Sequence, residues 1–138
     1  MTEDRYSQFV IKQFKHWKLQ IFENQGYLGR CIVWCDRENA LELTDVTEEE
    51  YLELLEIIKL WQQATKDCFE AEWHNYSFLG NITAHLHGHL VPRYSGSRTF
   101  AGITFTDALW GQRYQTDTSF VTPEPVLKKI QKELTDWF

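Results

Sequence analysis

The sequence predicts an α+β domain in which an antiparallel sheet of about five strands packs on one long helix. A long amphipathic pattern with a defined start covers residues 47–69, and short apolar runs typical of strands lie on both sides of it. Strands grouped before and after one helix, rather than alternating with helices, are typical of an antiparallel sheet with one covered face. We expect residues 1–138 to form this single domain, because 138 residues is a usual domain length.

The part of the chain before the long helix predicts one short helix and two strands. Aromatic and apolar residues recur at helical spacing over residues 6–16, which predicts the short helix. Apolar and polar residues alternate over residues 17–22, and an apolar run covers residues 31–35, so both stretches predict strands. Residues 24–26, with the sequence Asn-Gln-Gly, indicate a turn between these strands.

The long helix is expected to begin after Thr47, whose hydroxyl can accept a hydrogen bond from an amide of the first turn. Glu50 is in position to bond back to this residue, as in a capping box. From Tyr51 to Phe69, apolar residues recur at helical spacing and form one face of the helix. We assign this face to core packing.

The part of the chain after the long helix predicts two further strands, over residues 75–80 and 85–91. Residues 95–115 are rich in glycine and threonine with scattered aromatic residues, which predicts an irregular segment. Residues 122–124 combine a threonine cap, a proline and an early acidic residue. This combination predicts a last helix that runs to about Leu134.

The composition limits the partners and the location of the protein. The net charge of −6 argues against binding the backbone of a nucleic-acid polymer, although local donors can still hold a small anion. No apolar run is long enough to span a bilayer, and the polar N-terminus lacks the apolar region of a secretory signal. We therefore expect a cytoplasmic protein without a membrane partner, whose three cysteines are reduced, buried thiols.

The most informative segment is HLHGHLVPRY, which begins at His85. In an extended segment, side chains two positions apart share a face, so His85, His87 and His89 form a row on one side. Gly88, on the other side, indicates that a bulky group or another backbone approaches closely. Three aligned imidazoles are costly as core filling, because each ring has two nitrogens that need partners. The row therefore indicates a functional site.

Three interpretations of this row are compatible with the residue chemistry. Imidazole is a common zinc ligand, although three rings along a straight strand do not converge on one ion, and only His16 and His74 remain as further histidines. The middle imidazole can instead attack phosphorus while one neighbour fixes its tautomer and the other assists the leaving group. An inert histidine-rich strand is the third interpretation.

The segment from His85 to Arg93 resembles the signature of the histidine triad (HIT) family, His-x-His-x-His followed by two apolar residues. Its Pro-Arg ending is similar to the fragile-histidine-triad branch of dinucleoside polyphosphate hydrolases and to its bacterial relatives. Residues 29–37, residues 44–47 and the Gly-Asn pair at 80–81 also resemble family stretches. The resemblance covers roughly residues 17–94. It implies a HIT-like fold and a nucleotide hydrolase or nucleotidyl transferase.

The resemblance implies a role for each histidine of the triad. His87 would attack the α-phosphorus of a nucleoside phosphoanhydride or phosphoramidate and form a nucleotidyl-histidine, which water then hydrolyses. A backbone carbonyl of the motif strand, that of His85, would hold the other nitrogen of the attacking ring. His89 would bond the bridging or leaving atom. Adenine nucleotides, including diadenosine polyphosphates, are the substrate class that the resemblance indicates.

The resemblance also implies ligand contacts outside the triad. Asn75 and Asn81 match positions that hold phosphate oxygens, and Asn24 resembles a residue that contacts the ribose. For Asn24 and Asn75, a turn or cap role is the alternative. Arg30 stands where the family commonly has a fourth histidine. An arginine stays charged and can clamp a phosphate oxygen, but it cannot shuttle a proton.

The resemblance further implies a homodimer that is formed through the long helix and a sheet edge, where Trp61 and the exposed part of the helix face would contribute. The protein itself would need no metal or other cofactor, although Mg²⁺ can accompany a polyphosphate substrate. Two alternatives remain open. One is a nucleotide-binding or sensing module with little turnover, because Arg30 replaces a histidine, and the other is a zinc hydrolase.

Overall fold

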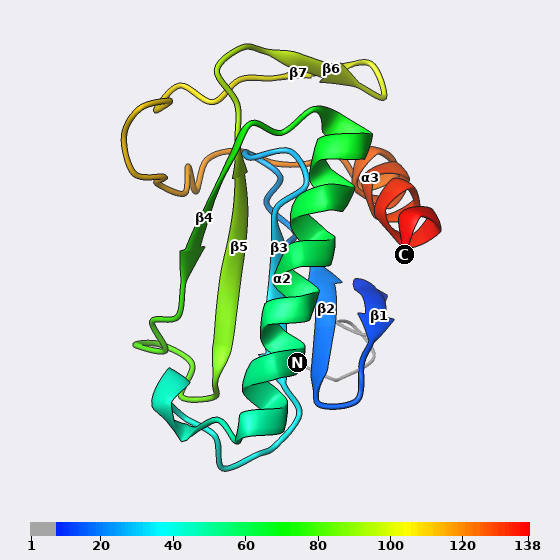
Figure 1. Cartoon of the computed structure of the whole chain (residues 1–138). Helices are drawn as coiled ribbons and strands as arrows, with labels where there is room; N and C mark the ends of the chain where they lie inside the picture. Colours follow the sequence, from blue (N-terminus) through cyan, green and yellow to red (C-terminus); the bar gives the residue numbers. More distant parts are fainter. Residues whose placement is uncertain (1–7) are drawn as a thin grey trace.

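The computed structural model describes residues 8–138, which contain a five-stranded sheet (Figure 1). The spatial order of the strands is β1-β2-β3-β5-β4, and all neighbouring pairs are antiparallel. The strands are β1 (Val10–Gln13), β2 (Trp17–Ile21), β3 (Cys31–Cys35), β4 (Trp73–Ser77) and β5 (His87–Arg93). The long helix α2 (Glu48–Phe69) connects β3 to β4 and lies across one face of the sheet. The predicted α+β architecture is confirmed.

Shorter elements flank the sheet and α2. A 3₁₀ turn, η1 (Leu43–Asp45), precedes α2. The hairpin of β6 (Arg98–Phe100) and β7 (Ile103–Phe105) lies beyond one end of the sheet, and the last helix, α3 (Glu124–Trp137), lies beside α2 and β1 (Figure 1). Among the described residues, neither long helix combines the length and apolar composition that a bilayer span requires.

The structure corrects two of the predicted elements. Residues 10–13 form the edge strand β1 rather than part of a helix over residues 6–16, because hydrogen bonds to β2 override the helical spacing of the side chains. Residues 6 and 7 of that prediction lie outside the described residues. Within the segment that was expected to be irregular, residues 98–105 form a hairpin. Its turn residues Ala101 and Gly102 have positive φ angles of 52° and 80°.

Three element boundaries also differ from the predictions. β4 covers Trp73–Ser77 instead of residues 75–80, and Gly80 follows it with a φ of 69°, which takes the chain out of the strand direction. β5 begins at His87 instead of residue 85. The last helix continues past Leu134 to Trp137.

The strand register divides the sheet into a core face and an open face. Residues that are paired across two strands lie on the same face. The pairs Leu19–Val33, Val33–Gly88 and Cys31–Leu90 belong to the core face, and the side chains of all but the glycine join the buried cluster that α2 contributes to. The residues that alternate with them point to the other side of the sheet, which we call the open face.

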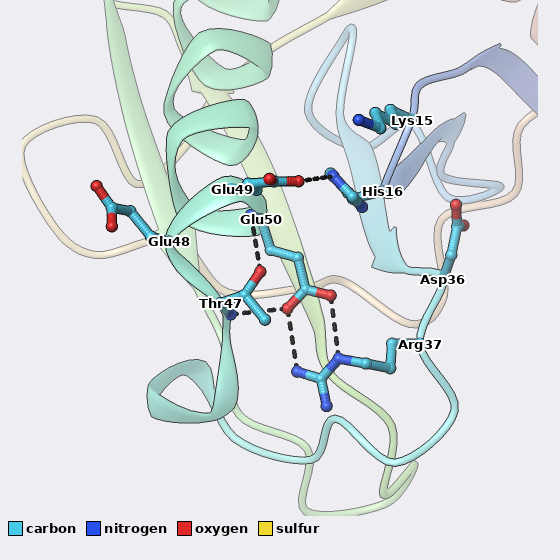
Figure 2. A pocket seen from close by; sticks show the side chains of 8 residues that line it. All are labelled: Lys15, His16, Asp36, Arg37, Thr47, Glu48, Glu49 and Glu50. Carbon is cyan, nitrogen blue, oxygen red and sulfur yellow. Dashed lines mark hydrogen bonds and ion pairs between the residues drawn. The ribbon is translucent and has the colours of Figure 1, made fainter.

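The start of α2 is held by a capping box and an ion pair (Figure 2). The hydroxyl of Thr47 accepts a hydrogen bond from the Glu50 amide at 3.1 Å, and the Thr47 amide donates to Oε1 of Glu50 at 2.8 Å. Arg37, which follows β3, donates to both carboxylate oxygens of Glu50 at 3.1 and 3.0 Å. These bonds, led by those from Arg37, outweigh burial and lower the pKa of Glu50 to about 2. They tie α2 to the end of β3.

We predict that Glu50→Gln makes the stability of the protein less sensitive to acid. A carboxylate with a folded-state pKa of about 2 and an unfolded-state pKa of about 4.3 contributes stability that is complete above the unfolded-state value. This contribution is lost as the pH falls toward about 2. The free energy of unfolding, measured by urea denaturation across this pH window, should therefore fall less steeply in the variant.

The matched control is Glu124→Gln, which alters an exposed carboxylate that is paired with Lys128 on the surface of α3. We expect this control to keep the wild-type pH dependence, because exposed ion pairs contribute little to stability. A wild-type slope in Glu50→Gln would show that the carboxylate is not stabilised by its contacts with Arg37 and Thr47.

Candidate active site

Two histidines of the motif lie on the open face of the sheet. His87 and His89 of β5 pair with Trp34 and Ile32 of β3, on the side opposite to Gly88. The centroids of the two imidazole rings are 5.6 Å apart, and both side chains are half-buried. The two rings therefore border the same space.

His85 lies just before β5, so the extended row of three histidines is corrected to a row of two. Its Nε2 donates a hydrogen bond to the backbone carbonyl of Cys35 at the end of β3. Its ring also contacts Trp34 edge-on, with the centroids 5.9 Å apart. These contacts hold His85 at the turn that leads into the strand.

The His87 ring is held in one tautomer and one orientation. Its Nδ1 lies 2.6 Å from the backbone carbonyl of His85, the hydrogen bond that the family resemblance implies. A carbonyl can only accept, so Nδ1 carries a proton, and in the neutral ring the lone pair is therefore on Nε2. The indole of Trp34 stacks on the ring, with the centroids 4.5 Å apart and the planes 25° apart. The geometry thus fixes the tautomer of the neutral imidazole, in which the lone pair is on Nε2.

The His89 ring is held in the opposite tautomer. Its Nδ1 lies 3.1 Å from Nη2 of Arg30. A guanidinium only donates, so Nδ1 of His89 accepts, and its Nε2 carries the proton. Burial, followed by the charges of Arg30 and His87, lowers the pKa of His89 to about 4. His89 is therefore a neutral hydrogen-bond donor near pH 7.

Arg30 is a buried cation with an unusual set of neighbours. Arg30 is 3% exposed. Its Nη1 donates to the Thr116 hydroxyl at 2.8 Å, and its Nε has no hydrogen-bond partner among the described residues. The guanidinium lies 4.2 Å from the centroid of the Phe22 ring and 5.0 Å from that of Tyr114. Within residues 8–138 no carboxylate forms an ion pair with Arg30. Burial lowers its pKa.

Gly88 leaves room for an aromatic ring on the core face. A Cβ at this position would lie 2.8 Å from Cδ1 of Phe78 and closer still to two other atoms of the ring. This confirms that a bulky group approaches the glycine. Phe78 therefore packs directly on the backbone between His87 and His89.

The three asparagines have different environments. Asn75 lies on the open face of β4, and its Oδ1 accepts a hydrogen bond from Arg93 at 2.7 Å. Asn81 is exposed in the loop between β4 and β5. Asn24 holds a turn, since its side-chain oxygen accepts from the Gly26 amide at 2.8 Å. Its amide group donates at 2.8 Å to a backbone carbonyl of the segment after β7.

The segment of residues 107–117 forms a wall beside the open face. Arg93, the last residue of β5, anchors it. The guanidinium of Arg93 donates to both oxygens of the buried Asp107 carboxylate at 2.7 and 3.0 Å. It also donates to the backbone carbonyls of Leu109 and Gln112 at 2.9 and 2.7 Å. Arg93 is therefore saturated with partners within the chain.

The site contains residues that the sequence did not indicate. Tyr114 hydrogen-bonds through its hydroxyl to Ser77, which pairs with His89 across the sheet, and Thr116 bonds Arg30. Both lie in an irregular segment, where no periodicity predicts their direction. Trp34 was within reach of prediction, because it occupies an alternate position of a buried strand and must leave the core face.

The remaining potential metal ligands lie apart from the triad. His16 pairs with Glu49 at 3.3 Å near the start of α2 (Figure 2), and Nε2 of His74 lies 2.9 Å from the Thr65 hydroxyl of that helix. Nowhere in residues 8–138 do three or more His, Cys, Asp or Glu side chains come together as a group that could hold a metal ion. The three cysteines are free thiols, and Cys31 and Cys35 are buried as expected, whereas Cys68 is only partly buried.

Known structures of the same fold are found, although searches against protein-family models and curated proteins find no match. A histidine triad protein from Sinorhizobium meliloti has a TM-score of 0.77 and 18% identity, covering 100% of this chain and 96% of that chain. A hypothetical histidine triad nucleotide-binding protein from Sulfolobus tokodaii has a TM-score of 0.71 and 15% identity, with coverages of 94% and 82%. A zinc-bound histidine triad family protein from Mycobacterium smegmatis has a TM-score of 0.63 and 16% identity, with coverages of 93% and 84%. The chain therefore has the histidine triad fold.

Arg93→Met is expected to lower the free energy of unfolding by about 3–5 kcal/mol, because it leaves the buried Asp107 carboxylate without its partner. Urea denaturation measures this loss. The double variant Arg93→Met, Asp107→Leu should recover a large part of it, since neither charge then remains buried.

The control for this experiment is Arg113→Met, which removes an exposed arginine from the same segment. Its free energy of unfolding should stay within about 0.5 kcal/mol of the wild-type value. A loss of similar size in both single variants would contradict the anchoring role of Arg93.

Proposed function

We propose that the chain is a nucleotide hydrolase or nucleotidyl transferase in which Nε2 of His87 attacks the α-phosphorus of a nucleoside phosphate. The observation that carries the proposal is the hydrogen bond from Nδ1 of His87 to the His85 carbonyl, which leaves the lone pair on Nε2. A neutral imidazole in this tautomer attacks without first losing a proton. The histidine triad fold supports the proposal, and the Sulfolobus tokodaii protein of this fold is described as nucleotide-binding.

In the first step, the lone pair of His87 Nε2 forms a bond to phosphorus, and the bond from phosphorus to the bridging atom breaks. The leaving group departs with that electron pair. His87 keeps its Nδ1 proton and becomes a cationic nucleotidyl-imidazolium, whose N–H still donates to His85. The Nε2–H of His89 is placed to donate a hydrogen bond to the bridging atom, where negative charge develops.

In the second step, water adds to phosphorus and the bond from phosphorus to Nε2 breaks. The electron pair returns to His87, and one water proton is released with the nucleoside monophosphate. The stacked Trp34 ring supports this sequence, because an aromatic face stabilises the cationic imidazolium of the intermediate. An alcohol or phosphate acceptor in place of water would make the reaction a nucleotidyl transfer.

Two asparagines are proposed to hold the phosphate. Asn75 accepts from Arg93 through its oxygen, which orients its amide group as a donor on the open face. Asn81 is exposed in the loop that leads toward the triad and has the same donor group. A ribose contact from Asn24 would use the second hydrogen of its amide group, because the oxygen and the first hydrogen already hold the turn.

The two alternative functions are a nucleotide-binding module and a zinc hydrolase. A binding module with little turnover is favoured by Arg30, which replaces a proton-carrying histidine with a permanent cation. A zinc hydrolase is suggested by the zinc-bound protein from Mycobacterium smegmatis. Among the described residues of this chain, however, no three His, Cys, Asp or Glu side chains come together as a group that could hold a metal ion. We therefore propose no resident metal, and Mg²⁺ would accompany a polyphosphate substrate.

We further propose a cytoplasmic homodimer that is formed through α2 and the edge strand β4. Exposed apolar residues gather on these elements, including Tyr51, Leu52, Leu55, Trp73 and Tyr76, which are 53%, 56%, 41%, 66% and 37% exposed. Burial of such a surface is the usual driving force of association. Trp61 was expected at this interface, but it is fully buried within the protomer and takes no part in the proposed contact.

We predict that wild-type protein mixed with a diadenosine polyphosphate forms a covalent nucleotidyl adduct on His87. Rapid quenching followed by peptide mass spectrometry should locate the added nucleotide. His87→Ala should abolish the adduct and lower turnover by at least about 10³-fold, because the nucleophile is lost. Calorimetric titration should still detect nucleotide binding by this variant.

Each alternative would appear as a different result. Binding without a covalent adduct in the wild type would favour the binding module. Turnover that requires added zinc and survives in His87→Ala would favour the zinc hydrolase. His74→Gln is the control variant, since His74 lies on the core side of β4, and it should keep the adduct.

For the oligomer, Leu52→Glu and Leu55→Glu together are expected to shift the protein from dimer to monomer, because charges at a buried apolar contact oppose association. Analytical ultracentrifugation over a range of protein concentrations measures this shift. Val121→Glu, at a residue that is 80% exposed and lies away from α2 and β4 in the sequence, should leave the wild-type dimer unchanged. A monomeric wild-type protein would refute the assembly.

A further inference from the structure

We infer that Arg30 holds His89 as a neutral donor and thereby restricts the enzyme to leaving groups that depart without a proton. The substrate class is then a nucleoside phosphoanhydride and not a phosphoramidate. This inference rests on the proposed function and narrows it. The geometry that carries it is the contact between the Arg30 guanidinium and Nδ1 of His89.

The guanidinium occupies the only nitrogen at which His89 could gain a proton. Nε2 already carries one, so a second proton must bind at Nδ1, which lies 3.1 Å from Nη2 of Arg30. Arg30 has no lone pair to offer, so a proton at Nδ1 would face another donor. Protonation of His89 would therefore break the contact with Arg30 and place two cations side by side.

Arg30 is not free to move away from this contact. Phe22 and Tyr114 lie against the guanidinium, at 4.2 and 5.0 Å from its central carbon, and the Thr116 hydroxyl holds Nη1. Only 3% of Arg30 is exposed, so the side chain is enclosed by the protein. Arg30 is buried and contacts His89 at Nδ1. This placement favours an action of Arg30 through the imidazole over direct contact with a phosphate oxygen.

Among the described residues, no carboxylate forms an ion pair that would offset the repulsion between the two cations. The charged and titratable groups that face His89 are Arg30 from the start of β3, His87 from β5 and the Tyr114 phenol, which reaches Ser77 on β4. None of these is a carboxylate. Burial and the two basic neighbours lower the pKa of His89 to about 4, in agreement with the geometry.

This arrangement discriminates between leaving groups. When a phosphoanhydride bond breaks, the departing phosphate oxygen is a stable anion near neutral pH, and a hydrogen bond from His89 is sufficient. When a phosphoramidate bond breaks, the departing nitrogen must receive a proton, because an amide anion is far too basic to leave. Neutral His89 could give that proton only by becoming an imidazolate, which is also strongly basic. General acid catalysis is therefore not available from His89.

A direct test reads the protonation of His89 in the free protein. Nitrogen NMR of imidazole-labelled wild-type protein should show an unprotonated Nδ1 and a protonated Nε2 for His89 down to about pH 5, because the cation is disfavoured. In Arg30→His, which restores a side chain able to accept a proton, His89 should titrate at a higher pH. A wild-type His89 that is cationic at pH 6, or protonated at Nδ1, would overturn the inference.

A kinetic test compares diadenosine triphosphate with adenosine 5′-phosphoramidate. The wild type should have a higher kcat/KM for the anhydride, and Arg30→His should shift the ratio toward the amidate by about tenfold or more, as removal of a block on general acid catalysis would. Arg30→Lys keeps a donor-only cation and should keep the preference. An unchanged ratio in a folded Arg30→His protein, as judged by its thermal unfolding, would overturn the inference.

The two tests separate the inference from the proposed function. If the wild type cleaves neither substrate and forms no adduct, the proposed function fails, and the substrate restriction, which rests on it, is overturned with it. The NMR result still decides whether Arg30 holds His89 neutral. If the wild type cleaves the amidate as well as the anhydride, the proposed function stands and the restriction on leaving groups fails.

Discussion

The placement of β5 between β3 and β4 is the constraint on which the rest of the structure depends. Hydrogen bonds to both neighbours fix its register, so adjacent residues have opposite environments. Leu90 enters the core, while His87 and His89 reach the open face. A slip by one residue would bury the two imidazoles and expose the leucine. The geometry of the candidate site and the stability of the core are thus consequences of one register.

Two buried arginines near the C-terminal end of β5 have opposite electrostatic environments. Arg93 is paired with Asp107, and its remaining donors meet an asparagine and backbone carbonyls, so its charge serves the fold. Arg30 meets aromatic faces, a hydroxyl and an imidazole, and no carboxylate of residues 8–138 forms an ion pair with it. In an acidic protein, a buried cation without an ion-pair partner among the described residues, in contact with His89, would suit the anionic substrate of the proposed function.

The parts of the molecule that were predictable from sequence are those with local signals. The capping box at Thr47 and the periodic face of α2 depend on residues near one another in the chain, and alternation alone places His87 and His89 on one side. β1 was mistaken for a helix because its partner strand, not its own spacing, decides its backbone. Two of the neighbours of Arg30, Tyr114 and Thr116, could not be foreseen, since they belong to an irregular segment.

The contact between Phe78 and Gly88 also constrains how this protein can change over time. Any side chain at position 88 collides with the aromatic ring, so a replacement there is tolerable only after residue 78 has become smaller. The reverse order is open, because a smaller residue at position 78 leaves a void rather than a collision. Substitution at position 78 must therefore precede substitution at position 88. For as long as the aromatic ring remains, it also restricts changes in the backbone position between His87 and His89.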